Sequence, residues 1–316
     1  MLQTRKVGIV GAGHVGAHVA LALLQSGEAD DIVLIDAIPE KAAAQAMDLS
    51  DCVSGSLCGR DTRIRAGGYE ELQDADVLVI AFGRSRRPGE TRLDMFDDSI
   101  RMAKDVITQL RQVHFSGITI SVSNPADIVC EYIRRQMGWP RQRCFCTGTS
   151  LETYRLLRVL SQHTGCSRRS IQGLCMGEHG NSGFVVWSHV FVQGRLFTDI
   201  CRDNPALAAD IAALQQEVKR AGDMEIDGKG CTEFGIANVV HMLIAAVFHD
   251  QKLIWPCSVA LDGEFGESQV AASVPCMIGK NGVEAIVPIS LTPEEQQAFY
   301  ASCDIIRDFL KRADTL

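Results

Sequence analysis

Residues 6–36 constrain the fold of this chain more than any other stretch. Lys6–Val10 is a short, nearly continuous apolar run, which is typical of a strand buried in a parallel sheet. A glycine-rich turn at 11–16 follows at once, and the next residues have the pattern of a helix. A second apolar run at 32–35 ends at Asp36, twenty positions after the last glycine of the turn. This order of strand, glycine turn, helix, strand and acid predicts a dinucleotide-binding unit.

The three glycines of the turn have different tasks. Gly11 permits a tight turn, Gly13 lets the backbone approach a pyrophosphate, and Gly16 allows the helix to pack closely on the strand. The N–H groups that begin the helix favour phosphates. Asp36 would accept hydrogen bonds from an adenine-ribose diol and repel a 2′-phosphate, so the pattern favours NAD over NADP. The alternative is a glycine-rich packing turn in an α/β fold.

Strand and helix patterns continue to alternate through the first half of the chain. Strands are expected at 62–65, 77–80, 118–122 and 144–146, and helices at 39–49, 93–113 and 128–137. Such alternation predicts an α/β fold, with a doubly wound parallel sheet of the Rossmann type in residues 1–147. Ligands then bind at the carboxyl ends of the strands.

The alternation loosens after residue 147, where a mixed α+β substrate domain is expected at 148–316. Its expected helices are at 151–162, 205–221 and 232–248, and its strands at 171–176, 184–187, 259–261, 275–278 and 283–288. A last helix is expected to begin after Thr292, which is placed to cap it, with Pro293 at the first position. Two lobes suit a chain of 316 residues.

Composition excludes several classes of function. The formal net charge is −8 and no block of five like charges occurs, so no nucleic-acid partner is expected. No run of eighteen apolar residues occurs, so no membrane-spanning helix is expected. Twelve cysteines in a chain of this size predict reduced thiols in a cytoplasmic protein. No cluster of side chains has the spacing of metal ligands, so no metal is expected.

A histidine between two glycines is the leading candidate for proton transfer. His179 lies next to Glu178, and imidazole is the side chain that titrates nearest neutral pH. A structural turn histidine is the alternative. The connection from Gly83 to Arg92 holds four arginines and two glycines, and glycine hinges let such a loop close over a substrate. A solvated basic loop is the alternative there.

The whole chain resembles the L-lactate/L-malate dehydrogenase superfamily. The motifs that carry the resemblance are GAGHVG at 11–16 with Asp36, PGETRLD at 88–94, SNP at 123–125, GTSLETYR at 148–155, GEHGNS at 177–182, GKGCT at 228–232 and VPCMI at 274–278. They occur in the order that the family has. The resemblance implies an NAD-dependent L-2-hydroxy-acid dehydrogenase that acts on a small 2-hydroxy or 2-keto acid.

The resemblance assigns the chemistry to four residues. His179 matches the catalytic histidine, which takes the hydroxyl proton and returns it in the reverse reaction. Arg92 matches the loop arginine that polarises the carbonyl, and Arg155 matches the arginine whose planar fork grips the substrate carboxylate. Glu152 stands where the family usually has Asp bonded to the imidazole. We predict that this pairing survives the additional methylene.

Further residues match the family's binding positions. Asn124 matches a residue that hydrogen-bonds near the reacting oxygen and the nicotinamide, and its bond to Pro125 is often cis in the family. Thr232 and Ile236 match residues that line the substrate pocket. The cofactor contacts that the resemblance implies are Gly11, Gly13, Val15, Gly16, Asp36, Gly83 and Asn124.

Arg86 leaves the identity of the substrate open. It falls on the specificity position, where lactate enzymes usually have Gln and malate enzymes have Arg for a second carboxylate. The motifs around Arg92 and His179 resemble lactate enzymes instead. Asn181 replaces a usual Asp, as in some enzymes of branched substrates, whose loop is longer. We therefore expect an L-lactate dehydrogenase, with malate dehydrogenase and L-2-hydroxyisocaproate dehydrogenase as alternatives.

The resemblance also implies an assembly and an absence of regulation. A homo-tetramer or dimer is expected, with helix faces such as 43–49 and 151–160 in the contacts. Some members are activated by fructose 1,6-bisphosphate through a paired Arg and His, but the matching positions here are Leu157 and Gln172, so no activation is expected. A non-catalytic NAD-binding regulator is the remaining alternative, and the complete catalytic set argues against it.

Overall fold

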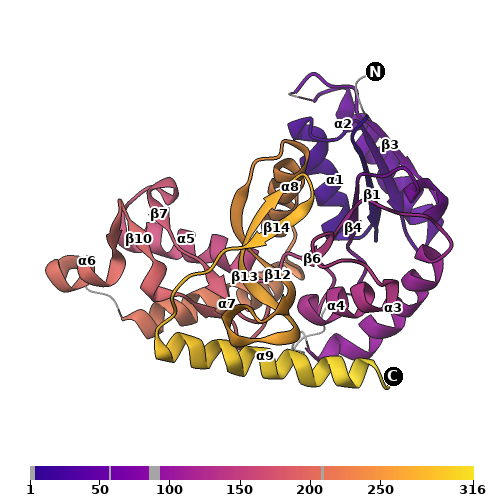
Figure 1. Cartoon of the computed structure of the whole chain (residues 1–316). Coiled ribbons are helices and arrows are strands. Elements are labelled where there is room, and N and C mark those ends of the chain that lie inside the picture. Colours follow the sequence, from indigo (N-terminus) through magenta and orange to yellow (C-terminus); the bar gives the residue numbers. More distant parts are fainter. Residues whose placement is uncertain (1–3, 57, 85–92, 208–209) are drawn as a thin grey trace.

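The computed structural model describes residues 4–56, 58–84, 93–207 and 210–316 (Figure 1). The strands of the first half are β1 (Lys6–Val10), β2 (Asp31–Ile35), β3 (Arg63–Ala66), β4 (Val77–Ile80), β5 (Ile118–Ser121) and β6 (Cys144–Cys146). Its helices are α1 (His14–Ser26), α2 (Pro39–Val53), α3 (Phe96–Leu110) and α4 (Ala126–Met137). These elements follow the predicted order, and their bounds differ from the predicted ones by a few residues.

The strands of the first half lie parallel in the order β6-β5-β4-β1-β2-β3, which confirms the predicted sheet. Val7 in the middle of the sheet has Ile32 on one side and Val77 on the other. All residues of β1, β2 and β4 are buried, which is why these strands show continuous apolar runs. The strand order reverses between β1 and β4, so the switch point lies beside the glycine turn.

The second half extends the same sheet. Its strands β12 (Leu253–Asp262), β13 (Ser268–Gly279) and β14 (Gly282–Ile286) add antiparallel to β6 in the order β6-β12-β13-β14. The remaining strands are β7 (Ile171–Gln172), β8 (Cys175–Met176), β9 (Phe184–Val185), β10 (Phe191–Val192) and β11 (Arg195–Leu196). The helices are α5 (Ser150–Thr164), α6 (Phe197–Asp203), α7 (Ile211–Lys229), α8 (Phe234–Phe248) and α9 (Pro293–Ala313).

Strands β12 and β13 are much longer than the sequence predicts. A proline within an apolar run argues against an inner strand because it lacks an N–H donor. Here Pro256 and Pro275 lie directly opposite each other in the ladder, so the two missing donors fall at one position of the pair. Ser258 and Ser273 also face each other and are buried, which interrupts the apolar pattern further.

Helix α7 begins later than the predicted helix at 205–221. The Asp210 side chain accepts a hydrogen bond from the N–H of Ala213 at 3.1 Å and caps the helix there. The helix then continues to Lys229 and ends at Gly230, which has a left-handed φ of 87°. The end of α7 thereby reaches the pocket described below.

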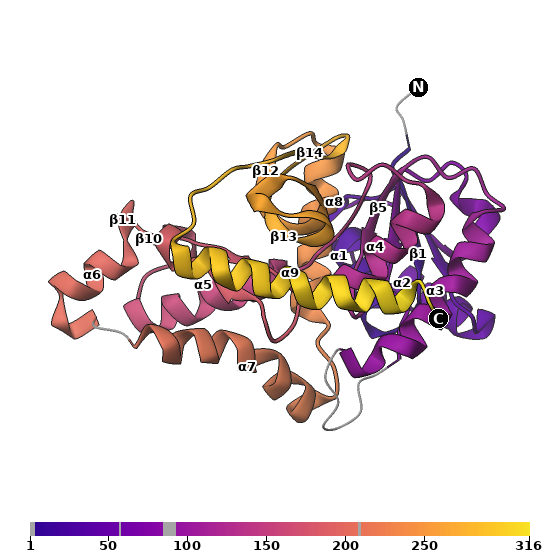
Figure 2. The same ribbon diagram turned by 60° about the horizontal axis from the view of Figure 1, so that its bottom comes forward.

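Helix α9 runs along both halves of the chain (Figures 1 and 2). It begins at the predicted cap: Thr292 accepts from the N–H of Glu295, whose carboxylate accepts from the N–H of Thr292. At its other end Arg312 packs over the Phe96 ring of α3, 4.8 Å from the centroid. None of the helices in the described ranges has the length and apolar content that a membrane crossing requires.

Candidate active site

The glycine turn between β1 and α1 has the geometry that the sequence predicts. Gly11 has a φ of 107°, and a Cβ there would lie 2.5 Å from the backbone of Ala81. A Cβ on Gly16 would lie 1.9 Å from the Gly11 carbonyl oxygen, so the helix approaches the turn as closely as glycine permits. A Cβ on Gly13 would meet only Lys41 Nζ at 3.7 Å. Gly13 therefore presents open backbone where a pyrophosphate is expected.

Asp36 supports this turn from the end of β2. Its Oδ2 accepts a hydrogen bond from the N–H of Ala12 at 2.8 Å, and its Oδ1 accepts from the N–H of Ile38 at 3.0 Å. Lys41 Nζ lies 3.4 Å from Oδ2. A carboxylate can accept further hydrogen bonds, so this anchoring is compatible with the ribose contact that the sequence predicts.

His179 and Glu152 form a buried pair. His179 lies in the turn between β8 and β9, lines the pocket and is 9% exposed. Its Nδ1 lies 3.1 Å from Oε2 of Glu152, which is in the first turn of α5. The predicted pairing is therefore present despite the additional methylene. Because Nδ1 is engaged, Nε2 is the ring nitrogen that remains for a ligand in the pocket.

The turn that carries His179 is anchored by other carboxylates and hydroxyls. The His179 N–H donates to Oδ2 of Asp127 at 2.8 Å. Asp127 is buried in α4, and this burial raises its pKa from the usual 3.8 to about 6. The carboxylate of Glu178 faces the N–H of Ser182 at 3.2 Å rather than the imidazole, and the Glu178 N–H donates to Ser302 of α9 at 2.8 Å.

Arg155 continues the chain of contacts from His179. It is 4% exposed, and Nη1 lies 3.4 Å from the Oε1 of Glu152, whose other oxygen faces His179. Its Nη2 donates to Oε2 of Glu225 at 2.7 Å, and the Thr232 hydroxyl donates to the same oxygen at 3.1 Å. Five side chains from α5, α7 and their neighbouring turns thus share one network.

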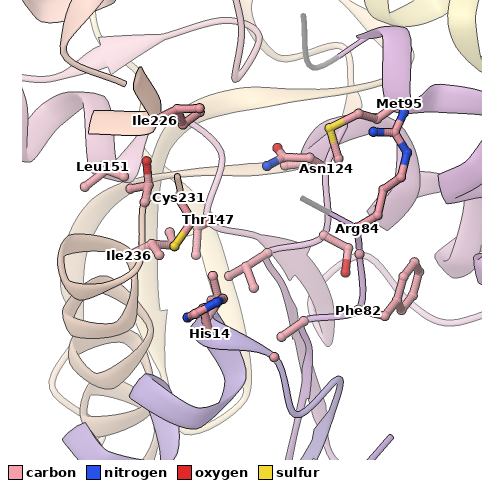
Figure 3. A pocket seen from close by; sticks show the side chains of 18 of the residues that line it. His14, Phe82, Arg84, Met95, Asn124, Thr147, Leu151, Ile226, Cys231 and Ile236 are labelled. Carbon is pink, nitrogen blue, oxygen red and sulfur yellow. The ribbon is translucent and has the colours of Figure 1, made fainter. Parts of the chain in front are cut away.

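The pocket lies between the two halves of the chain (Figure 3). Apolar side chains of α5, α7 and α8 form one wall, namely Leu151, Ile226 and Ile236, and Asn124 and Met95 lie across from them. Val15, Gly83, Arg155, His179 and Thr232 also line it. Oδ1 of Asn124 is buried with no hydrogen-bond partner among the described residues, and the Asn124–Pro125 bond is cis.

Two predicted site residues, Arg86 and Arg92, lie outside the described residues. Arg84, just before them, is placed: its Nε contacts Oδ2 of Asp98 at 2.8 Å. Asp98 lies on α3 and is partly exposed, and this contact fixes the Arg84 side chain against α3.

One group of side chains near the pocket has the composition of metal ligands. His14, Cys231 and Glu233 offer ligand atoms within 4.8 Å of one another. His14 is more than 200 positions from the other two, so sequence spacing gives no sign of this group. Lys229 Nζ lies 2.6 Å from Glu233 and balances its charge. The contact of His14 with Glu233 connects the start of α1 to the start of α8. The absence of a metal stays a prediction.

The residues around the glycine turn fit a dinucleotide. The turn leaves Gly13 open, and Asp36 stands at the end of β2. The pocket extends from Gly13 to Asn124 and His179. Fold and site together define a dinucleotide-binding enzyme with a buried His–carboxylate pair beside the cofactor position.

Sequence comparison places this class within one family. The NAD-binding domain of lactate/malate dehydrogenases matches residues 5–146, and their alpha/beta C-terminal domain matches residues 149–315. The chain therefore belongs to the lactate/malate dehydrogenase family. It is an NAD-dependent oxidoreductase that acts on 2-hydroxy acids.

Curated relatives and solved structures match over nearly the full chain. An L-lactate dehydrogenase of Fusobacterium nucleatum is 39% identical over 313 residues, covering 98% of each chain. The ligand-bound crystal structure of a minor L-lactate dehydrogenase from Enterococcus mundtii has a TM-score of 0.92 at 32% identity, with 98% of each chain covered. A malate dehydrogenase from Cryptosporidium parvum has a TM-score of 0.94 at 25% identity, covering 99% of this chain and all of its own.

Sequence reasoning did not identify Asp127, Glu225 or Lys219. Asp127 follows the SNP motif and is a carboxylate at the start of a buried helix, which is a signal that was available. Glu225 lies 70 positions from Arg155 on an amphipathic helix, where a glutamate resembles any surface residue. Lys219 donates to the backbone oxygen of Asn181 at 2.9 Å, and burial lowers its pKa.

Proposed function

We propose that this protein is an L-lactate dehydrogenase that reduces pyruvate with NADH and catalyses the reverse reaction. The observation that carries this proposal is the contact chain His179–Glu152–Arg155 within one pocket. It combines a proton donor, the carboxylate that supports it and a cation for the substrate carboxylate. The similarity to L-lactate dehydrogenases over nearly the whole chain supports the same substrate.

His179 exchanges the proton of the reaction. NAD, when bound, supplies the acceptor or donor of the hydride. Nε2 of His179 takes the hydroxyl proton of lactate, and in the reverse direction it protonates the carbonyl oxygen of pyruvate. Glu152 at Nδ1 holds the ring in the tautomer that leaves Nε2 free to accept, and its charge stabilises the imidazolium that forms.

The other residues orient the substrate. Arg155 presents a planar fork to the substrate carboxylate, which fixes the reacting carbon beside His179. We propose that Asn124 hydrogen-bonds near the reacting oxygen, since its buried Oδ1 lacks a partner among the residues described. Arg92 is proposed to polarise the carbonyl as negative charge develops on its oxygen.

Malate dehydrogenase is the second candidate. Arg86 at the specificity position favours a second carboxylate on the substrate, and the similarity to the Cryptosporidium malate dehydrogenase is compatible with it. The lactate proposal is preferred because the relatives of higher identity are named L-lactate dehydrogenases.

A comparison of substrates tests both candidates. We expect kcat/KM with NADH to be higher for pyruvate than for either oxaloacetate or 2-ketoisocaproate. A preference for oxaloacetate that collapses in Arg86→Gln would establish the malate alternative. A preference for 2-ketoisocaproate would favour a branched-substrate enzyme.

We further propose a homo-tetramer in the cytoplasm, in which residues 1–147 bind NAD and 148–316 bind the substrate. Along α2 the exposed Met47, 71% exposed, and the small exposed Ala43 and Ala44 suit a helix–helix contact. Most apolar side chains of α5 are already buried within the chain, so α5 is the weaker of the two expected assembly faces. None of the twelve cysteines, all of which are described, forms a disulfide, which suits a reducing compartment.

A further inference from the structure

Glu225 occupies two hydrogen-bond donors that line the pocket, one on Arg155 and one on Thr232. A single oxygen, Oε2, accepts from Arg155 Nη2 at 2.7 Å and from the Thr232 hydroxyl at 3.1 Å. Arg155 and Thr232 both line the pocket, and Arg155 is buried. The side chain of Glu225 therefore presents to Arg155 the same chemical group, a carboxylate, that a 2-keto acid presents.

Charge repulsion disfavours a substrate carboxylate beside Arg155 while Glu225 stays in place. Arg155 already contacts Glu152, which stays in place because its other oxygen faces His179. A third carboxylate would place three negative charges around one buried guanidinium at short range, and such like-charge contacts are costly where solvent is excluded. Of the two resident carboxylates, Glu225 is the one that can leave.

The exposure of Glu225 keeps the free-energy cost of this displacement low. Its side chain is 41% exposed, whereas that of Glu152 is 12% exposed, so a rotation returns the Glu225 charge to water rather than burying it. Glu225 lies near the C-terminal end of α7, next to Ile226, whose side chain forms part of the pocket wall in Figure 3. Gly230 ends this helix two positions before Thr232.

We propose that Glu225 is an internal competitor for the substrate-carboxylate position on Arg155 and so sets the affinity of the enzyme for its keto acid. This inference rests on the proposed function. Because the competition is lost once substrate is bound, it weakens binding of the ground state and the transition state equally. Glu225 therefore raises KM and leaves kcat unchanged.

The test compares Glu225→Gln, Glu225→Asp and the control Glu217→Gln. Glu217 lies on the same helix and contacts Arg158 at 3.5 Å, so its substitution makes the same charge change away from the pocket. We expect Glu225→Gln to lower KM for pyruvate and Kd for oxamate, measured with NADH bound, by about tenfold, which corresponds to about 1.4 kcal/mol. We expect kcat to stay within about twofold and Glu217→Gln to resemble the wild type.

Glu225→Asp separates direct competition from long-range repulsion. The shorter side chain keeps the charge but draws the carboxylate away from Arg155, so direct competition predicts a lower KM and Kd in this variant also. Wild-type affinity in Glu225→Asp, or a fall in kcat in either variant, would overturn the inference. Oxamate binding is measured without turnover, so it decides the role of Glu225 even if the wild type reduces no 2-keto acid, an outcome that would instead refute the proposed function.

Discussion

Removing the charge of Glu152 is expected to slow the chemical step and spare substrate binding. In Glu152→Gln the side chain keeps its shape, but the carboxylate oxygen 3.1 Å from His179 Nδ1 becomes part of a neutral amide. The carboxylate matters most when the imidazole is protonated, since only then do two opposite charges face each other. The substitution therefore acts on the step in which His179 holds the proton of the substrate.

The size of the effect follows from the burial of the pair. Both side chains are only 10–12% exposed, so solvent screens the interaction weakly. Two charges 3.1 Å apart attract by about 5 kcal/mol at an effective dielectric constant of 20, which is an upper limit because both charges are delocalised. Hydrogen bonds to charged groups contribute about 1.5–3 kcal/mol, so we expect kcat to fall by about 10- to 200-fold.

Steady-state rates of NADH oxidation with pyruvate measure this effect. KM is expected to stay or fall, because Glu152→Gln also removes one of the carboxylates on Arg155. Glu152→Asp is the matched variant that keeps the charge, and its kcat should fall less than that of Glu152→Gln. A kcat within threefold of the wild type in Glu152→Gln would show that Glu152 does not support His179.

Three further predictions concern stability, the cofactor and regulation. Burial raises the pKa of Asp127 to about 6, so the native state binds more protons than the unfolded state between about pH 4 and 6, and this group makes the protein less stable as pH rises through that window. In urea unfolding, the stability of Asp127→Asn relative to the wild type should increase by about 2 kcal/mol between pH 4 and 7, and a pH-independent difference would exclude this cause. Gly16→Ala should weaken NADH binding at least about tenfold in fluorescence titrations, because its Cβ would lie 1.9 Å from the Gly11 oxygen, whereas Gly55→Ala, with nothing within 4 Å, should bind normally. Fructose 1,6-bisphosphate should leave the KM for pyruvate unchanged, and a large decrease on its addition would refute the assignment of the matching positions.

The strands of the parallel half of the sheet were predictable because their burial produces a recognisable pattern within each segment of the sequence. Strands β1 and β4 are buried on both faces, so their sequences are continuous apolar runs bounded by turns. The glycine turn was equally readable, since Gly11 and Gly16 occupy positions where a Cβ would collide with backbone. Local sequence therefore specifies the cofactor side of the pocket.

The antiparallel strands left no comparable signal. The prolines and buried serines of β12 and β13 are compatible with a sheet because each proline lies opposite a proline and each serine opposite a serine on the other strand. The sequence alone does not show that Pro256 and Pro275 lie opposite each other in the sheet. The predicted strands therefore covered only parts of β12 and β13.

In the candidate site, too, some contacts were predictable from the sequence and others were not. The pairing of Glu152 with His179 was predicted from the family resemblance, and the additional methylene is accommodated at 3.1 Å. Glu225 and Asp127 contact Arg155 and His179 across long sequence separations, and nothing in their own segments specifies those partners. The three-dimensional contacts thus add what the motifs omit, namely the carboxylates that surround His179 and Arg155.

The assignment of His179 as the proton donor is tested most directly by the rate of NADH oxidation with pyruvate in the wild type and in His179→Asn. We expect the wild type to form L-lactate, and His179→Asn to lose at least about a hundredfold in kcat while binding NADH as the wild type does. Pyruvate reduction by His179→Asn at a rate close to that of the wild type would show that the proton comes from another group.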